Sequence, residues 1–215
     1  MIRIPLIIGF ILVASAAGAG NLETPTPTIQ PTLTPIAMQS GKSWDGFYAG
    51  GLVAFESGEH NYFADGTFTN GPWALEGTTF GAFVGYNYQS GSMVYGAEAA
   101  YALGDVNSNV PATFGANYSS FLDVKARAGY TVGDALLYGV VGGSLGSWED
   151  RTGPPDTASA TGLNYGLGVD YQISDTLFVG AEYLVRDLSG DFDNDSTVGM
   201  DSLTQSAQIR VGLQF

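Results

Sequence analysis

The sequence predicts an all-β fold, an eight-stranded antiparallel up-and-down transmembrane β-barrel. Three observations predict it. Segments of alternating polar and apolar residues follow one another, separated by turn-forming residues. Glycine supplies 31 of the 215 residues, which disfavours long helices. The final segment, which ends at Phe215, has the length and two-residue period of one tilted strand that crosses a bilayer.

Composition supports strands rather than helices as the membrane-spanning elements. Hydrophobic residues make up 45% of the chain, but no stretch after Val13 has the ~18 apolar residues that indicate a membrane helix. The formal net charge of −14 disfavours nucleic acid as a partner. The absence of cysteine excludes disulfides and a lipidated N-terminal cysteine, and with one histidine it excludes a conventional zinc site. We therefore expect no cofactor.

The N-terminal region reads as an export signal followed by a spacer. Arg3 supplies the positive charge of the n-region of a signal peptide, and residues 4–13 form its apolar core. Residues 17–19 supply a small-residue cleavage site. A stretch rich in threonine and proline follows and predicts an extended chain without packed structure. We expect a signal peptide over 1–19, a periplasmic Thr/Pro-rich spacer over 20–43 and an outer-membrane β-barrel over 44–215.

The barrel segment divides into strands joined alternately by short turns and long links. Short turns are expected around 89–92, 132–134 and 173–175, and long loops at 57–76, 106–117, 149–160 and 189–202. This asymmetry is typical of bacterial outer-membrane barrels, whose turns face the periplasm and whose loops face outward. The first strand should pair with the last, because hydrocarbon cannot satisfy an exposed strand edge. The expected strands are 44–56, 77–89, 93–105, 118–131, 135–148, 161–172, 176–188 and 203–215.

Alternation within the strands predicts which side chains face the lumen. In a membrane barrel the lipid-facing residues are apolar and the lumen-facing residues are polar. Four acidic and four basic side chains then point inward, and their charges balance to zero. A charge at this depth is tolerated only when it is paired or hydrated, so we expect an interlocked ionic plug. Its members are Glu98, Asp123, Lys125, Arg127, Asp170, Glu182, Arg186 and Arg210.

Aromatic residues lie at a spacing typical of two membrane-interface girdles. Four pairs are separated by eight to twelve residues near opposite strand ends, which matches an apolar band about 25 Å tall. A soluble sandwich or lipocalin-like barrel would instead point its aromatics inward and its charges outward. Tyr48, Phe83, Phe121 and Phe178 are expected inside the lumen. The expected girdle pairs are Phe47 and Phe55, Phe80 and Tyr88, Tyr118 and Tyr130, and Tyr138 and Trp148.

Most remaining acidic residues fall in the predicted loops. The segment Asp191-x-Asp193-x-Asp195 begins like a calcium loop, but Ser196 replaces the glycine and Ser202 the glutamate that such a loop needs. We expect at most weak divalent-cation binding at a solvated acidic surface. The predicted first loop carries Glu56, Glu59, Asp65 and Glu76, and the last carries Asp187, Asp191, Asp193, Asp195 and Asp201.

One short motif resembles part of a hydrolase site. The segment 142–146 matches the pattern around a nucleophilic serine, which needs a strand-turn-helix context and a histidine partner. Ser144 lies within a predicted strand, and the sole histidine, His60, is expected in the first long loop. Because both requirements are missing, we predict no catalytic residue.

Both ends of the predicted barrel resemble a known family. Residues 44–51 (Trp-Asp-Gly-Phe-Tyr-Ala-Gly-Gly) and 210–215 (Arg-Val-Gly-Leu-Gln-Phe) are similar to the first and last strands of the outer-membrane beta-barrel domain family. That family includes porin-family proteins and opacity-like surface antigens with an OmpA-like eight-stranded barrel. The resemblance implies that Phe215 is the signal read by the barrel-assembly machinery.

The expected function is a non-enzymatic structural or envelope-integrity role in the bacterial outer membrane, with acidic surface loops. Fold alone does not specify function, so three alternatives stay open: a surface adhesin or host-interaction antigen, a narrow porin-like channel, and an outer-membrane lipid hydrolase. Expected partners are outer-membrane lipid, lipopolysaccharide and the barrel-assembly machinery. We expect the protein to be a monomer.

Overall fold

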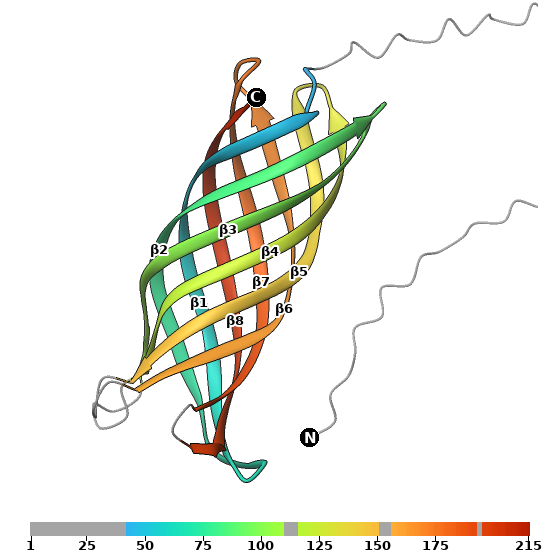
Figure 1. Cartoon of the computed structure of the whole chain (residues 1–215). Helices are drawn as coiled ribbons and strands as arrows, with labels where there is room; N and C mark the ends of the chain where they lie inside the picture. Colours follow the sequence, from blue (N-terminus) through green and yellow to red (C-terminus); the bar gives the residue numbers. More distant parts are fainter. Residues whose placement is uncertain (1–41, 110–115, 151–155, 193–194) are drawn as a thin grey trace, which may run out of the picture. The chain divides into compact units, whose positions relative to one another are not determined.

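The computed structural model describes residues 42–109, 116–150, 156–192 and 195–215, which form a closed antiparallel β-barrel in sequence order (Figure 1). The predicted fold class is confirmed. The described residues contain no helix that could cross a membrane. The strands are β1 (Gly46–Ala64), β2 (Thr67–Ser90), β3 (Met93–Ser108), β4 (Ala116–Val132), β5 (Ala135–Asp150), β6 (Asp156–Gln172), β7 (Leu177–Phe192) and β8 (Asp195–Gln214).

Closure is made by the seam between β1 and β8. The pairing runs without a register shift from Tyr48 opposite Gln214 to Ala64 opposite Val198. Beyond it, the Phe215 amide donates to the Phe47 carbonyl at 2.8 Å. Every strand therefore has two hydrogen-bonded neighbours, and no edge is left to face hydrocarbon.

The two ends of the barrel differ in their connections. At one end, here called the turn end, β2–β3, β4–β5 and β6–β7 are joined by short turns, and the C-terminus lies beside them at the top of Figure 1. The other end, called the loop end, holds the connections at 65–66, 109–115, 151–155 and 193–194. The predicted signal peptide and most of the spacer lie outside the described residues.

The predicted long loops are wrong over most of their length, because the strands continue into them. β1 runs on to Ala64 and β2 begins at Thr67, so only Asp65 and Gly66 remain between them. Both have positive φ angles, 50° and 70°, which an Asp-Gly pair adopts readily in a two-residue hairpin turn. The predicted loops at 106–117, 149–160 and 189–202 are likewise partly strand.

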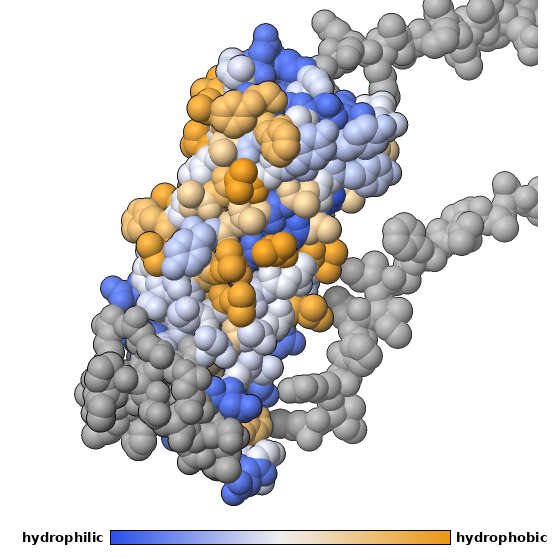
Figure 2. Space-filling model, viewed as in Figure 1, coloured by the Kyte–Doolittle hydropathy of each residue, from blue (hydrophilic) through white to orange (hydrophobic). Residues whose placement is uncertain are grey.

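Large apolar side chains are exposed on the exterior of all eight strands. On the face in Figure 2, apolar patches alternate with weakly polar side chains over the middle, and strongly hydrophilic side chains lie at both ends and in a small central patch. Five predicted girdle residues are exposed on the barrel exterior: Phe47, Phe55, Phe80, Tyr88 and Tyr130. The prediction is wrong for the other three, because Tyr118, Tyr138 and Trp148 are buried in the lumen. The strand irregularity between Tyr118 and Ser120 reverses the facing of Tyr118 relative to Tyr130.

Two apolar layers fill the lumen near its ends. The layer toward the turn end contains Trp44, Tyr48, Phe83, Tyr138 and Phe178. The layer toward the loop end, here called the loop-end layer, contains Leu75, Val106, Tyr118, Phe121, Trp148, Leu188 and Met200. The charged side chains contact one another between and beside these layers, as an eight-stranded barrel is just wide enough for its side chains to fill.

Candidate functional site

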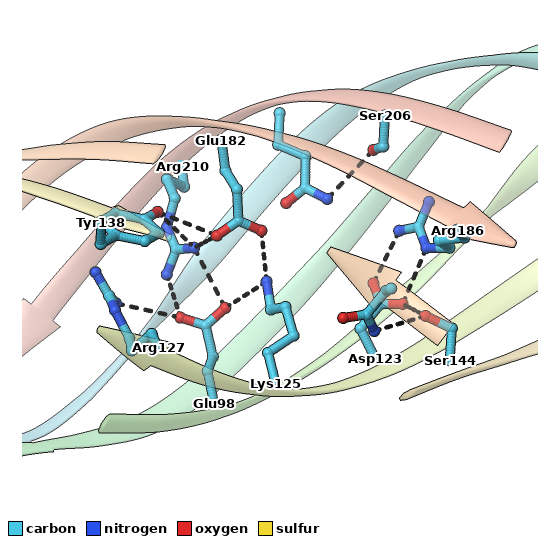
Figure 3. Close-up of polar contacts among 12 residues, drawn as sticks. Glu98, Asp123, Lys125, Arg127, Tyr138, Ser144, Glu182, Arg186, Ser206 and Arg210 are labelled. Carbon is cyan, nitrogen blue, oxygen red and sulfur yellow. Dashed lines mark hydrogen bonds and ion pairs between the residues drawn. The ribbon is translucent and has the colours of Figure 1, made fainter. Parts of the chain in front are cut away.

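Besides His60, nine acidic and basic side chains of the described residues are buried in the lumen and fall into two groups. Figure 3 labels all of these nine except Glu56 and Asp170. All eight predicted lumen charges lie in these two groups rather than in one interlocked plug, and Glu56 joins them. The groups are named here by their central arginines. The Arg210 cluster contains Glu98, Lys125, Arg127, Asp170, Glu182 and Arg210, and the Arg186 cluster contains Glu56, Asp123 and Arg186.

Arg210 and Lys125 bridge the carboxylates of the first group. The Arg210 guanidinium makes a close ion pair with Glu98 and another with Glu182, where Nη1 lies 3.0 Å from Oε2. Lys125 Nζ lies 2.9 Å from a Glu98 oxygen and 2.5 Å from a Glu182 oxygen. Because both cations share the same two carboxylates, removing one side chain disturbs several ion pairs at once.

Arg127 completes the Arg210 cluster. Its Nη2 lies 2.8 Å from Asp170 Oδ2, and its guanidinium stacks 3.8 Å from the centre of the Tyr138 ring. The Tyr48 hydroxyl accepts a hydrogen bond from Arg127 at 3.0 Å and donates one to Glu98 at 2.9 Å. With three acidic and three basic side chains, the cluster is formally neutral. Full pairing of this kind is what makes buried charge tolerable.

The Arg186 cluster has two carboxylates for one guanidinium. Arg186 forms a two-pronged contact with Asp123, at 2.9 Å from Nε and 2.8 Å from Nη2, and reaches Glu56 at 3.0 Å from Nη1. Such forked pairs are strong because two aligned hydrogen bonds act together. Hydroxyl groups supply the remaining donors: Ser144 to Asp123 at 2.5 Å, Thr79 to Glu56 at 3.0 Å and Ser206 to Glu56 at 3.1 Å.

The predicted position of Glu56 in an acidic loop is wrong. Glu56 faces the lumen, only 4% exposed, and the buried charges are therefore five acids against four bases rather than a balanced set. The signal for this was present, because Leu52, Ala54 and Glu56 continue one alternating face of β1. The expected strand end at residue 56 hid that continuity.

Glycines on neighbouring strands make room for the lumen tyrosines. A Cβ atom added at Gly85 would lie 2.3 Å from Tyr48 Cζ, and one added at Gly168 would lie 2.3 Å from Tyr138 Cζ. Real Cβ contacts are never so short, so each ring lies directly on a glycine backbone. Both tyrosine hydroxyls are thereby held beside the Arg210 cluster, where Tyr138 donates to Glu182 at 3.1 Å.

Ser144 and His60 do not form a catalytic pair. The Ser144 hydroxyl donates to Asp123 and accepts from Asn164 Nδ2 at 2.7 Å, so it belongs to the Arg186 cluster. His60 was expected in a loop, and this is wrong: it is fully buried in β1, 5.2 Å from the Trp148 ring and 5.0 Å from the Tyr62 ring. Neither imidazole nitrogen has a hydrogen-bond partner among the described residues.

No candidate metal centre is present in the part of the chain that the structure describes. No group of three or more histidine, cysteine, aspartate or glutamate side chains there is arranged to hold an ion. Asp193 lies outside the described residues, so weak cation binding at the 191–195 segment stays a prediction.

The turn end of the lumen is closed by the segment that precedes β1. Trp44 was expected in the first strand but lies before it, only 1% exposed, with its ring centre 5.7 Å from that of Phe178. The Trp44 amide donates to Gln89 at 2.7 Å. The Gln172 and Gln214 side chains both donate to the Ser43 carbonyl, at 2.8 Å and 3.0 Å. Trp44 is thus a stopper held by three strands.

A closed, lipid-faced barrel with ionised side chains in its lumen defines an integral outer-membrane protein. The family model described as "Outer membrane protein beta-barrel domain" matches residues 31–215. The chain belongs to this family, and its location is the bacterial outer membrane.

Two curated relatives extend over most of the chain. A "22 kDa outer membrane protein" of Rhizobium leguminosarum bv. viciae is 31% identical over 185 residues, covering 80% of this chain and 79% of that protein. A "31 kDa outer-membrane immunogenic protein" of Brucella melitensis biotype 1 is 27% identical over 234 residues, covering 94% of each chain. Both are outer-membrane proteins by name.

Two solved structures share the fold at low sequence identity. Neisserial surface protein A has a TM-score of 0.52 and 14% identity, covering 80% of this chain and 98% of its own. OprG from Pseudomonas aeruginosa has a TM-score of 0.54 and 13% identity, covering 83% of this chain and 99% of its own. These likenesses support the barrel architecture alone.

Proposed function

We propose that this protein is a non-enzymatic structural component of the outer membrane, whose barrel stabilises the envelope without conducting solutes. The observation that carries the proposal is the filled lumen. Along the barrel, Trp44 closes the turn end, the two ionic clusters fill the middle, and Trp148 and its neighbours fill the loop-end layer. A solute would have to displace paired charges and packed aromatics together.

Planar-bilayer recording tests the closed lumen. Purified protein in a bilayer should give no conductance steps. A variant in which Trp44 and Phe178 are both replaced by alanine lacks the stopper and should also give no conductance steps, because the ionic clusters and the loop-end layer still fill the lumen. Regular unitary steps from the unmodified protein would establish the channel alternative. In cells, deletion should increase uptake of a hydrophobic dye through the envelope.

A second candidate is a surface antigen that contacts a host. It is favoured by the relative named as an outer-membrane immunogenic protein and by acidic side chains such as Asp65, Asp191 and Asp201 that lie exposed at the loop end. Adhesion of cells that display the barrel, lost when the loop-end hairpin at residues 61–70 is exchanged, would support this role. Unchanged adhesion after deletion of the whole protein would contradict it.

The proposal includes an orientation of the barrel in the membrane and a route of assembly. We assign the turn end to the periplasm and the loop end to the exterior, in keeping with the usual placement of short turns. Phe215, 76% exposed at the end of the seam, is accessible to the barrel-assembly machinery. Insertion should yield a monomer in contact with lipid and lipopolysaccharide.

A further inference from the structure

The outer wall formed by β6, β7, β8 and β1 carries an apolar groove at mid-height. Strand register places outward side chains in rows across these strands, and one row contains Phe55, Ala207, Tyr183 and Leu167. The next row toward the turn end contains Ala181 and Ile209. Together they line a groove of about 550 Å³. The two alanines form a floor between larger side chains, which suits an extended acyl chain.

A polar groove of about 740 Å³ lies on the same strands toward the loop end. Thr161, Ser189 and Asp201 form one of its rows, and Asp191 lies in the next. From Ala207 to Asp201 along β8 is six residues, or ~20 Å at the usual rise of a strand. One wall therefore presents an apolar groove and a polar groove within the length of a single lipid molecule.

The row between the grooves marks the change from lipid to headgroup depth. It contains Glu59, Leu203, Asp187 and Leu163, so carboxylates and leucines alternate along it. Below this row, toward the turn end, Gln205 accepts a close hydrogen bond from the Tyr183 hydroxyl. Glu59, Asp187 and Asp201 are exposed, and none of the described residues that line the two grooves is basic.

We propose that this wall binds one lipid of the loop-end leaflet, with an acyl chain in the apolar groove and an ammonium-bearing headgroup in the polar groove. Carboxylates attract an ammonium group and repel a phosphate, and the serine and threonine hydroxyls add hydrogen-bonding capacity. The apolar groove is continuous with the lipid-facing surface, which makes an acyl chain its natural occupant. A second copy that docked by the same wall would set these carboxylates against their own duplicates.

Quenching by brominated lipids tests the proposal. Ala207→Trp places a reporter in the apolar groove, and Ala126→Trp places a matched reporter at an exposed alanine on β4. Each variant of the full chain is reconstituted in phosphatidylcholine vesicles. Brominated probes are then added with a primary-ammonium headgroup lacking phosphate, with phosphatidylcholine, or with phosphatidylglycerol, the last with and without calcium.

The ammonium lipid should quench the Ala207→Trp reporter at severalfold lower mole fraction than phosphatidylcholine, with no such preference at Ala126→Trp. Adding Asp187→Asn and Asp201→Asn should abolish the preference, whereas Glu76→Gln on β2 should leave it intact. Equal quenching by all lipids, preference for phosphatidylglycerol in calcium, or a reporter shielded by a second copy would each overturn the proposal. It rests on insertion in the proposed orientation and not on the closed lumen, so its failure would leave the conductance result unaffected.

Discussion

The two ionic clusters compensate their buried charges in different ways. In the Arg210 cluster every carboxylate lies within 3.6 Å of two or more cationic groups, and the formal charges cancel. In the Arg186 cluster one guanidinium serves two carboxylates, and Thr79, Ser144 and Ser206 complete their hydrogen bonds. The first cluster depends on charge balance, whereas the second accepts a surplus negative charge by using neutral donors. This difference predicts unequal responses to similar substitutions.

The largest effect is expected for Arg186→Met. The substitution leaves Glu56 and Asp123 facing each other without a cation, and an uncompensated buried charge costs about 3–5 kcal/mol of unfolding free energy. Urea unfolding in detergent micelles, followed by tryptophan fluorescence, would measure this loss. Glu76→Gln on the exposed outer face is the control and should change little; a loss below 1 kcal/mol for Arg186→Met would contradict the pairing.

The next largest effect is the difference in unfolding free energy between the variants Glu98→Gln and Glu56→Gln. The first change leaves the Arg210 cluster with excess positive charge, and we expect a loss of about 3 kcal/mol. The second removes the surplus carboxylate charge while keeping an acceptor for Thr79 and Ser206, so we expect about 1 kcal/mol or less. The same unfolding assay compares them, and equal losses would show that charge balance does not distinguish the clusters.

Gly85→Ala should have an intermediate cost. The added methyl group would force the Tyr48 ring away from Glu98 and Arg127, and overpacking of this kind costs about 1–3 kcal/mol. Gly51→Ala is the matched control, because its Cβ would lie 3.6 Å from the Gly81 carbonyl oxygen, which is an ordinary van der Waals contact. Retarded migration on an unboiled detergent gel, together with the unfolding midpoint, would report the change, and equal behaviour of both variants would refute the contact.

The smallest effect is expected in the loop-end layer and has the opposite sign. His60→Phe removes two unpartnered nitrogens from an aromatic environment and should stabilise the barrel by about 1 kcal/mol. His60→Ala, which leaves a cavity, should destabilise it. A lower unfolding midpoint for the phenylalanine variant would indicate that the imidazole has a polar partner.

Sequence predicted the membrane-spanning half of the barrel better than the loop-end half. Where lipid surrounds the wall, outward residues such as Val124 are apolar and inward residues such as Lys125 are polar. Beyond the lipid the two-residue period continues with reversed polarity: Glu59 and Glu76 point out, and Leu75 points in. Because the prediction required apolar residues to face outward, it ended the predicted strands where the polarity of the two faces reverses. Glu56 and His60 were therefore assigned to a loop.

The ion-pair partners could not be predicted from the alternation. The alternation of polar and apolar residues assigned Glu98 and Arg210 to the lumen, but their ion pair joins β3 to β8 across the barrel. Which side chains meet depends on strand tilt and stagger, which closure of the whole sheet determines. The same applies to Arg186 and Glu56, which are separated by 130 residues.

The stopper at the turn end has a mechanical consequence. Because glutamines of β2, β6 and β8 grip the backbone around Trp44, tension on the preceding chain would be shared by three strands instead of peeling β1 from its neighbours. The turn end of the barrel can thus resist a pulling force that is applied at Ser43.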